Sequence, residues 1–189
     1  FYAGLLMSEG SIHKDDKLMR RGFFTLQDAV AAWPEFNLFT AGFVAGLQPH
    51  DSAMFRRGLD AMWRNADLCA GAPVDRANPD YAPYMRRETR EGPQRVCWNS
   101  WIAPHNFEGF FLHFGDMLVK AGEPERAVIM YGNARLTPDF ATWPYRDVLE
   151  ARIGDAARNV TVFREKDPPA DAPLMMVRSR HACTGCHQQ

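Results

Sequence analysis

The sequence predicts an all-α protein, a bundle or array of helical hairpins, from three observations. Apolar residues recur at helical spacing through most of the chain. Val, Ile and Thr do not gather into alternating runs, and no Asn-Gly or Asp-Gly turn separates apolar stretches, so strands and β-hairpins are not expected. The 189 residues are 46% hydrophobic and 24% charged, a balance typical of one compact globular domain.

The charge and the longest apolar runs exclude two classes of function. The formal net charge is −1, which gives no broad electrostatic attraction to nucleic acid. No apolar run approaches the roughly 20 residues that span a bilayer. Residues 1–7 are apolar but short, and they are compatible with the end of a longer export signal. The sequence leaves the oligomeric state open.

Residues 1–70 are expected to form an N-terminal helical segment of three helices. Thr25 is the expected N-cap of the first helix, and Pro34 ends it and begins the second. Asp51 or Ser52 caps the third. The apolar face of this third helix is formed by Phe55, Leu59, Met62, Trp63 and Ala66.

Residues 71–97 differ in composition from both neighbours. Pro, Asn, Asp and Gly are frequent there, which predicts a long loop rather than a helix. Loops of this length inside compact domains are uncommon and often functional. The loop divides the first segment from residues 98–166, yet a shared core is expected at this chain length.

Residues 98–166 are expected to contain a helical hairpin and one further helix. Gly115 and Ala127 allow two antiparallel helices to approach closely, Gly122 turns the chain, and Tyr131 fills the gap between them. The further helix begins at Thr142-Trp143-Pro144 and caps the pair.

The hairpin resembles a single tetratricopeptide repeat. The matching positions are Phe111, Phe114, Gly115, Leu118, Gly122, Ala127, Tyr131, Ala134 and Pro138. Two departures are present, because Pro138 comes one residue early and Pro124 stands where the repeat usually has an aromatic residue. A generic helical hairpin is the alternative. The resemblance implies a surface suited to docking another protein.

Residues 167–189 contain a proline-rich connection that leads into Cys183-Thr184-Gly185-Cys186-His187. Two cysteines separated by two residues place both thiols along one edge of a haem, where each thiol adds across a vinyl double bond. The next residue, His187, is then directed at the iron from the proximal side.

This motif resembles the haem-attachment site of c-type cytochromes. The resemblance implies one covalent haem c, with thioethers from Cys183 and Cys186 and with His187 as the proximal iron ligand. The place of the motif near the end of the sequence is similar to the layout of class II cytochromes, which are four-helix bundles. A zinc site or a redox-active dithiol is the alternative, but the first needs a second close ligand pair and the second usually lies in a βαβ pattern.

The other two cysteines, Cys69 and Cys97, are a disulfide candidate. In an exported protein such a bond would close a loop around the irregular middle of the chain. Two unrelated buried thiols are the alternative.

The iron ligand opposite His187 is expected to come from upstream. Met175 and Met176 are near in sequence, and Met ligation would favour electron transfer. His105 and His113 lie in an aromatic-rich stretch where a haem face could pack. An open sixth position is the alternative to all four.

Two arginines precede the motif and are candidates to bind the haem propionates. Arg178 and Arg180 carry the planar, bidentate donors that suit carboxylates. Two solvent-exposed charges are the alternative.

The leading hypothesis is a monohaem c-type cytochrome that transfers electrons to a redox partner protein. A five-coordinate haem that binds NO, CO or peroxide is the second hypothesis, and a protein-interaction module with a structural haem is the third. No other catalytic constellation is present, so an electron carrier is favoured over an enzyme. Covalent haem attachment needs a dedicated maturation system, which implies a periplasmic or otherwise extracytoplasmic location.

Overall fold

The structure is a computed structural model that describes residues 2–32, 42, 45–85 and 107–178. Six α-helices and no strand occur in these ranges, which confirms the predicted all-α class. The helices are α1 (Tyr2–Ile12), α2 (Asp16–Ala32), α4 (Ala53–Ala70), α5 (Phe107–Ala121), α6 (Pro124–Gly132) and α7 (Arg146–Arg164). Short 3-10 helices are η1 (Ala82–Tyr84), η4 (Asn133–Leu136), η5 (Phe140–Thr142) and η6 (Met176–Arg178).

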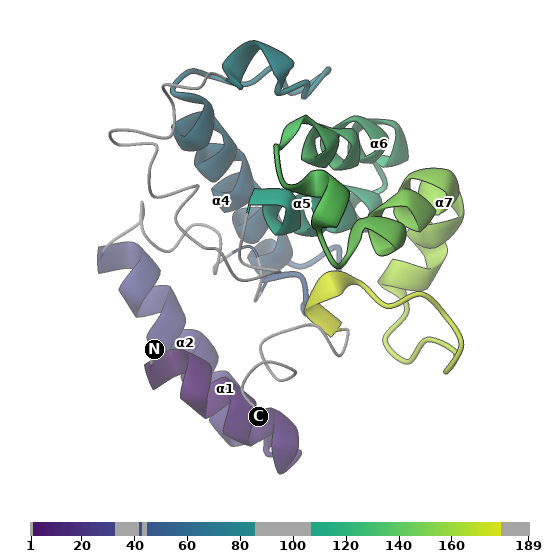
Figure 1. The fold of residues 1–189 in the computed structure, drawn as a ribbon. Coiled ribbons are helices and arrows are strands. Elements are labelled where there is room, and N and C mark those ends of the chain that lie inside the picture. The colour runs from purple at the N-terminus through teal and green to yellow at the C-terminus, as the bar shows by residue number, and fades with distance from the viewer. Residues whose placement is uncertain (1, 33–41, 43–44, 86–106, 179–189) are drawn as a thin grey trace.

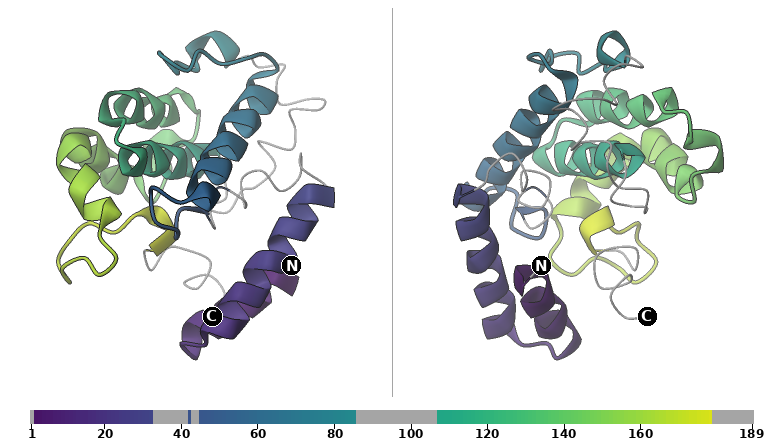
Figure 2. Two further views of the ribbon diagram at one scale, coloured as in Figure 1. Left: turned by 180° about the vertical axis from the view of Figure 1, so that it is seen from behind. Right: turned by 60° about the vertical axis from the view of Figure 1, so that its left-hand side comes forward.

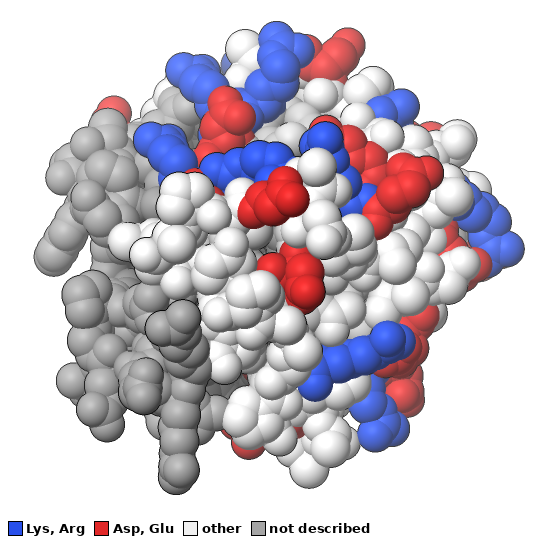
Figure 3. Space-filling view, turned by 90° about the horizontal axis from the view of Figure 1, so that it is seen from above, with Lys and Arg blue, Asp and Glu red and all other residues white. Residues whose placement is uncertain are grey.

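Helix α5 lies at the centre of the main body (Figure 1), with α6 and α7 packed against it and α4 crossing beside it. The antiparallel hairpin of α1 and α2 lies apart from this body, as the two views in Figure 2 also show. On the face seen in Figure 3, Lys and Arg are interspersed with Asp and Glu, and neither sign dominates the described surface there.

The prediction that Thr25 caps a helix is wrong. Helix α2 begins at Asp16, because the carboxylate of Asp15 accepts two backbone N–H groups of its first turn, at 2.8 and 3.2 Å. Thr25 lies inside this helix, where its hydroxyl donates to the carbonyl of Arg21 at 2.8 Å. Nearly all of the second expected helix, from Pro34, lies outside the described residues.

Helix α4 begins and ends as its sequence predicts. The hydroxyl of Ser52 accepts the N–H of Phe55 at 3.0 Å, which makes Ser52 the N-cap. Gly71 ends the helix in the left-handed region, with a φ of 72°. The predicted apolar face points inward, and Trp63 packs edge-on against Phe114 of α5 with ring centroids 4.6 Å apart.

The part of the predicted loop that the structure describes, residues 71–85, is irregular apart from η1. The side chain of Asn133 holds it against the body. Its carbonyl oxygen accepts the N–H of Tyr81 at 2.9 Å, and its amide donates to the carbonyl of Pro79 at 2.8 Å. Residues 79–81 of the described part are therefore held in place by side-chain hydrogen bonds.

Helices α5 and α6 form the predicted hairpin, and Gly122 turns the chain with a φ of 93°. The two helices approach each other closely at Gly115, because a Cβ there would overlap the ring of Tyr131. The guanidinium of Arg164, the last residue of α7, donates to the carbonyls of Lys120 and Ala121, both at 2.9 Å, and so caps the end of α5. The finer resemblance to a tetratricopeptide repeat stays a prediction.

The hydrophobic core joins α4 to α5, α6 and α7 in one cluster. Ala3 and Leu26, with the partly buried Met7, form a second and much smaller cluster inside the α1–α2 hairpin. Every residue of α5 from Phe107 to Lys120 is buried. A helix buried on all sides must find partners for each polar side chain it carries.

Replacing Gly115 by Ala is expected to destabilise the protein by about 1–3 kcal/mol, because the new methyl group would displace the Tyr131 ring from a packed core. Gly154 of α7 is a matched control, since a Cβ there meets no atom within 4 Å. Gly154→Ala is expected to stabilise by about 0.5–1 kcal/mol through helix propensity. Urea unfolding measures both, and equal effects would contradict the close approach.

Candidate functional site

The structure describes five of the residues that the sequence singles out for function, and the others lie outside the described residues. Those described are Cys69, His113, Met175, Met176 and Arg178. Those outside are Cys97, His105, Arg180, Cys183, Cys186 and His187. The site is therefore built from the residues that lead into the attachment motif and from those that surround them.

The carboxylate of Asp116 on α5 holds three separate segments together. It is fully buried, and it accepts the hydroxyl of Tyr131 at 2.7 Å and the Nε–H of Arg152 at 3.2 Å. Its second oxygen accepts the backbone N–H of Met176 at 2.6 Å. One carboxylate thus links α5 to α6, to α7 and to the segment that precedes the motif.

Residues 174–178 are fixed on the body by further contacts. The guanidinium of Arg152 also donates to the carbonyl of Leu174. Met175 and Met176 are buried in the main hydrophobic cluster. Arg178 donates to the carbonyls of Glu165 and Lys166, at 2.9 and 3.1 Å, so this predicted propionate ligand is engaged with backbone in the structure.

The ionisation of Asp116 reflects a balance between burial and its partners. Burial raises its pKa, whereas the Arg152 charge and the hydrogen bonds from Met176 and Tyr131 act in the opposite direction. Burial and the adjacent carboxylate raise the pKa of Tyr131 well above its ordinary value, so its hydroxyl stays a donor. The Asp116–Arg152 pair is charge-assisted and shielded from water.

His113 lies three residues before Asp116 on the same face of α5 and is fully buried. Burial lowers its pKa to about 4, and a hydrogen bond with the Gly42 backbone opposes that shift. The imidazole is therefore neutral near neutral pH, which is the form that binds metals. His113 is enclosed by the core rather than lining an open space.

Lys120 lies one further turn along this face and is 2% exposed. Its ammonium donates to the carbonyl of Gly46 at 2.8 Å and lies 5.7 Å from the centre of the Phe55 ring. Burial, with a smaller part from the Arg178 charge, lowers its pKa to about 8. Lys120 thus joins the turn at Gly46 to the last turn of α5.

Cys69 is buried on α4 and disulfide-bonded. Its partner lies outside the described residues, so the pairing with Cys97 stays a prediction.

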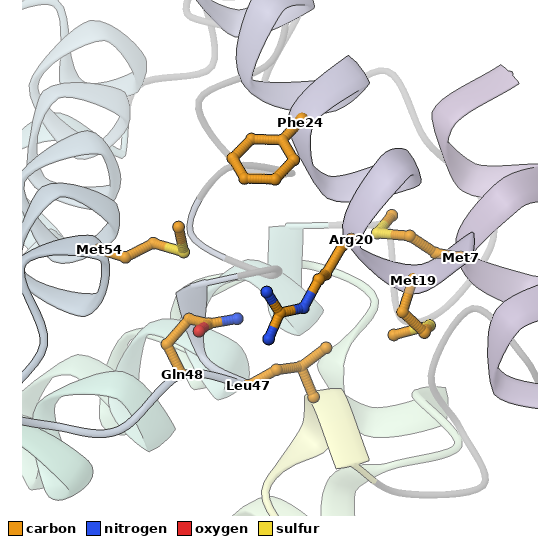
Figure 4. A pocket seen from close by; sticks show the side chains of 7 residues that line it. All are labelled: Met7, Met19, Arg20, Phe24, Leu47, Gln48 and Met54. Carbon is orange, nitrogen blue, oxygen red and sulfur yellow. The ribbon is translucent and has the colours of Figure 1, made fainter. Parts of the chain in front are cut away.

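A cavity of about 330 Å³ lies between the α1–α2 hairpin and the chain that enters α4 (Figure 4). No pattern in the sequence indicates this cavity. Its residues are widely separated along the chain, and none belongs to a recognisable motif. The lining residues are Met7, Met19, Arg20, Phe24, Leu47, Gln48 and Met54.

Two features are absent from the part of the chain that the structure describes. No cluster of three or more His, Cys, Asp or Glu side chains is placed to hold a metal ion within those ranges. None of the helices that the structure describes is long and apolar enough to cross a membrane.

Comparison of the chain with protein-family models, with curated proteins and with solved structures finds no match. The functional conclusion therefore rests on the sequence motif and on the geometry described above.

Replacing Arg152 by Met is expected to destabilise the protein by about 3–5 kcal/mol, because it leaves the Asp116 carboxylate buried without its counter-charge. Arg135 is a matched control, since its ion pair with Glu150 is solvent-exposed. Arg135→Met is expected to cost no more than about 1 kcal/mol. Chemical denaturation measures both. Similar losses in the two variants would contradict the central role of Asp116.

The lowered pKa of Lys120 predicts that stability rises with pH. In the window between its folded pKa of about 8 and its ordinary value of 10.5, the unfolded chain binds more protons than the folded one. Relative to Lys120→Met, the protein should gain stability across that window, by at most about 3 kcal/mol. The control is Lys166→Met at an exposed position, which should keep the full slope. A Lys120→Met variant with an unchanged slope would contradict the assignment.

Proposed function

We propose that the protein is a monohaem c-type cytochrome that carries electrons. Cys183 and Cys186 hold the haem as thioethers, and His187 is the proximal iron ligand. The five motif positions are in the required order, and the zinc and dithiol alternatives each need a second feature that the sequence lacks.

One structural observation supports this proposal above the others. The residues that lead into the motif are not a free tail, because Asp116 and Arg152 fix Met176 and Leu174 to the central helix. Only four residues, 179–182, separate the described Arg178 from Cys183. A haem attached there would be carried by a rigid support, which an electron carrier needs to hold its redox centre at a constant geometry.

The described residues also include a lining of the kind that suits an apolar ligand. Met, Phe and Leu side chains line the cavity between the α1–α2 hairpin and the chain that enters α4, and Arg20 in its wall offers a partner for an acidic group. Bound haem supplies a one-electron iron couple. Of the protein's own residues, Cys183 and Cys186 would hold the group, His187 would bind the iron, and Arg178 and Arg180 are the arginines nearest in sequence that could pair with its propionates.

The disulfide bond of Cys69 supports the proposed location. Disulfides persist in the periplasm and other oxidising compartments, and they are rare in the cytosol. Haem c attachment and this disulfide would therefore share an extracytoplasmic compartment. A redox partner protein is the proposed partner.

The absorption spectrum of protein co-expressed with a haem-maturation system tests the proposal. The parent protein should give a Soret band and a pyridine haemochrome that stays with the chain after denaturation. Cys183→Ala and Cys186→Ala should each weaken covalent attachment, and the double variant should abolish it. Cys69→Ser is the control and should retain haem despite lower stability. A parent protein that binds zinc and no haem would overturn the proposal.

A further inference from the structure

The cavity beside the α1–α2 hairpin combines an apolar lining with a single charge. Its walls carry three thioethers, one aromatic ring and one isobutyl group, and its polar groups are the guanidinium of Arg20 and the amide of Gln48. No acidic side chain is among the described residues that line it. The lining therefore favours an occupant that is apolar and carries negative charge.

This cavity is open to solvent rather than enclosed. Phe24 in its wall is 56% exposed, Arg20 is exposed, and the other lining residues are half-buried. Sites for small molecules usually bury roughly 70–90% of the ligand surface, which walls as open as these do not provide. A segment of another protein needs no such enclosure, because it buries the rest of its contact area on the surface around the cavity. Phe, Met and Arg are also residue types that are enriched in the cores of protein interfaces.

The three methionines give the cavity an adaptable lining on a fixed base. Met7 is anchored inside the hairpin, since a Cβ added at Gly22 would lie 2.6 Å from its Cγ. Met19 is anchored in the same way, with its Cγ 2.8 Å from a Cβ added at Gly10. Met54 extends towards the cavity from the first turn of α4, on the opposite wall (Figure 4). Thioether side chains are unbranched and flexible, so they adjust to partner side chains of different shape.

Arg20 is the charged group available to such an occupant. In Figure 4 its guanidinium extends between the two walls, towards Leu47 and Gln48. Among the residues that the structure describes, Arg20 forms no hydrogen bond or ion pair. Asp16 and Lys17, each one turn before it on α2, carry opposite charges, so the guanidinium itself supplies the net charge at the cavity. An acidic side chain placed there would gain a charge-assisted hydrogen bond without displacing an existing partner.

The fold decides the conformation of the segment that docks. A peptide that extends a sheet takes its backbone hydrogen bonds from an exposed strand edge, and the described ranges contain no strand. A segment that enters an apolar cavity must therefore satisfy its own backbone groups, which an α-helix does. The cavity lies between α2 and the chain that enters α4, where a further helix can pack against both walls.

We infer that this cavity is the docking site for an amphipathic helix of a partner protein. The apolar side chains of that helix lie among the three thioethers and Phe24, and one of its carboxylates pairs with Arg20. The inference goes beyond the proposed function, because the cavity contains no residue of the attachment motif and its chemistry is the same with or without haem.

The first experiment titrates the full chain into fluorescently labelled synthetic helices and follows the fluorescence anisotropy. The acidic peptide is about 16 residues long, because shorter helices are marginal in water, and it carries Leu at positions i, i+3, i+4 and i+7 with Glu beside them. The basic peptide has Lys in place of every Glu. The acidic peptide should bind at least about tenfold more tightly, and added salt should reduce this preference. Equal affinities, or no binding of the acidic peptide, would overturn the inference.

The second experiment reverses the charge of Arg20. Arg20→Glu should weaken binding of the acidic peptide and strengthen binding of the basic peptide, each by about tenfold, because one group changes sign against both. Arg158→Glu is the matched control, since Arg158 on α7 is also exposed and lies outside the cavity, and it should leave both affinities as in the parent. The inference fails if Arg20→Glu changes the two affinities no more than this control does.

The third experiment removes the exposed ring of Phe24. Phe24→Ala should keep the fold, which circular dichroism checks, and should weaken binding of the acidic peptide by about tenfold. Leu136→Ala, at an exposed apolar side chain outside the cavity, should bind as the parent does.

Two other occupants give distinct results in the same variants. Binding of dodecanoate that Arg20→Glu abolishes, without binding of the acidic peptide, would assign the cavity to a small amphiphile. A dimer of the free chain that Phe24→Ala dissociates in sedimentation would assign it to a second copy of this chain. Either result would overturn the docking of a partner helix.

Discussion

The burial of α5 on every side is the constraint on which the rest of the structure depends. Three of the four buried ionisable side chains of this helix, His113, Asp116 and Lys120, are at most 2% exposed. Leaving such groups unpaired costs several kcal/mol of folding free energy, so each one needs a partner from another part of the chain. Asp116 accepts hydrogen bonds from α6, α7 and the C-terminal segment, and Lys120 donates one to the turn before α4. The arrangement of segments around α5 follows from these needs as much as from apolar packing.

Local signals in the sequence were sufficient for much of the fold. Ser52 caps α4 and Gly122 turns the α5–α6 hairpin because a cap and a turn depend on residues a few positions apart. The start of α2 was not predicted. The side chain of Asp15 accepts the free N–H groups of the first turn, whereas Thr25 lies inside the helix. Helix α1 was not expected as a separate element, since the apolar residues 1–7 are also compatible with the end of a longer export signal or anchor.

The candidate site was less accessible to prediction than the fold. The proposed attachment motif could be predicted because its chemistry is local and depends on five consecutive residues in order. The Asp116 contacts join residues 15, 36 and 60 positions apart, and no periodicity in the sequence indicates them. The cavity is a gap between two elements and arises only from tertiary packing. The residues that line the cavity carry no sequence signal that distinguishes them from other surface residues.

The bond from Met176 to Asp116 also bears on the order in which this protein can fold. The central helix cannot complete its polar contacts until residues up to 176 have left the ribosome, because its carboxylate is satisfied in part by that late segment. Before then Asp116 faces the interior with an incomplete set of partners, which disfavours the compact state. The core and the segment leading to Cys183 therefore form one cooperative unit. A cofactor joined to that segment would be coupled energetically to the middle of the molecule, and its attachment and final packing would occur in the same late stage of folding.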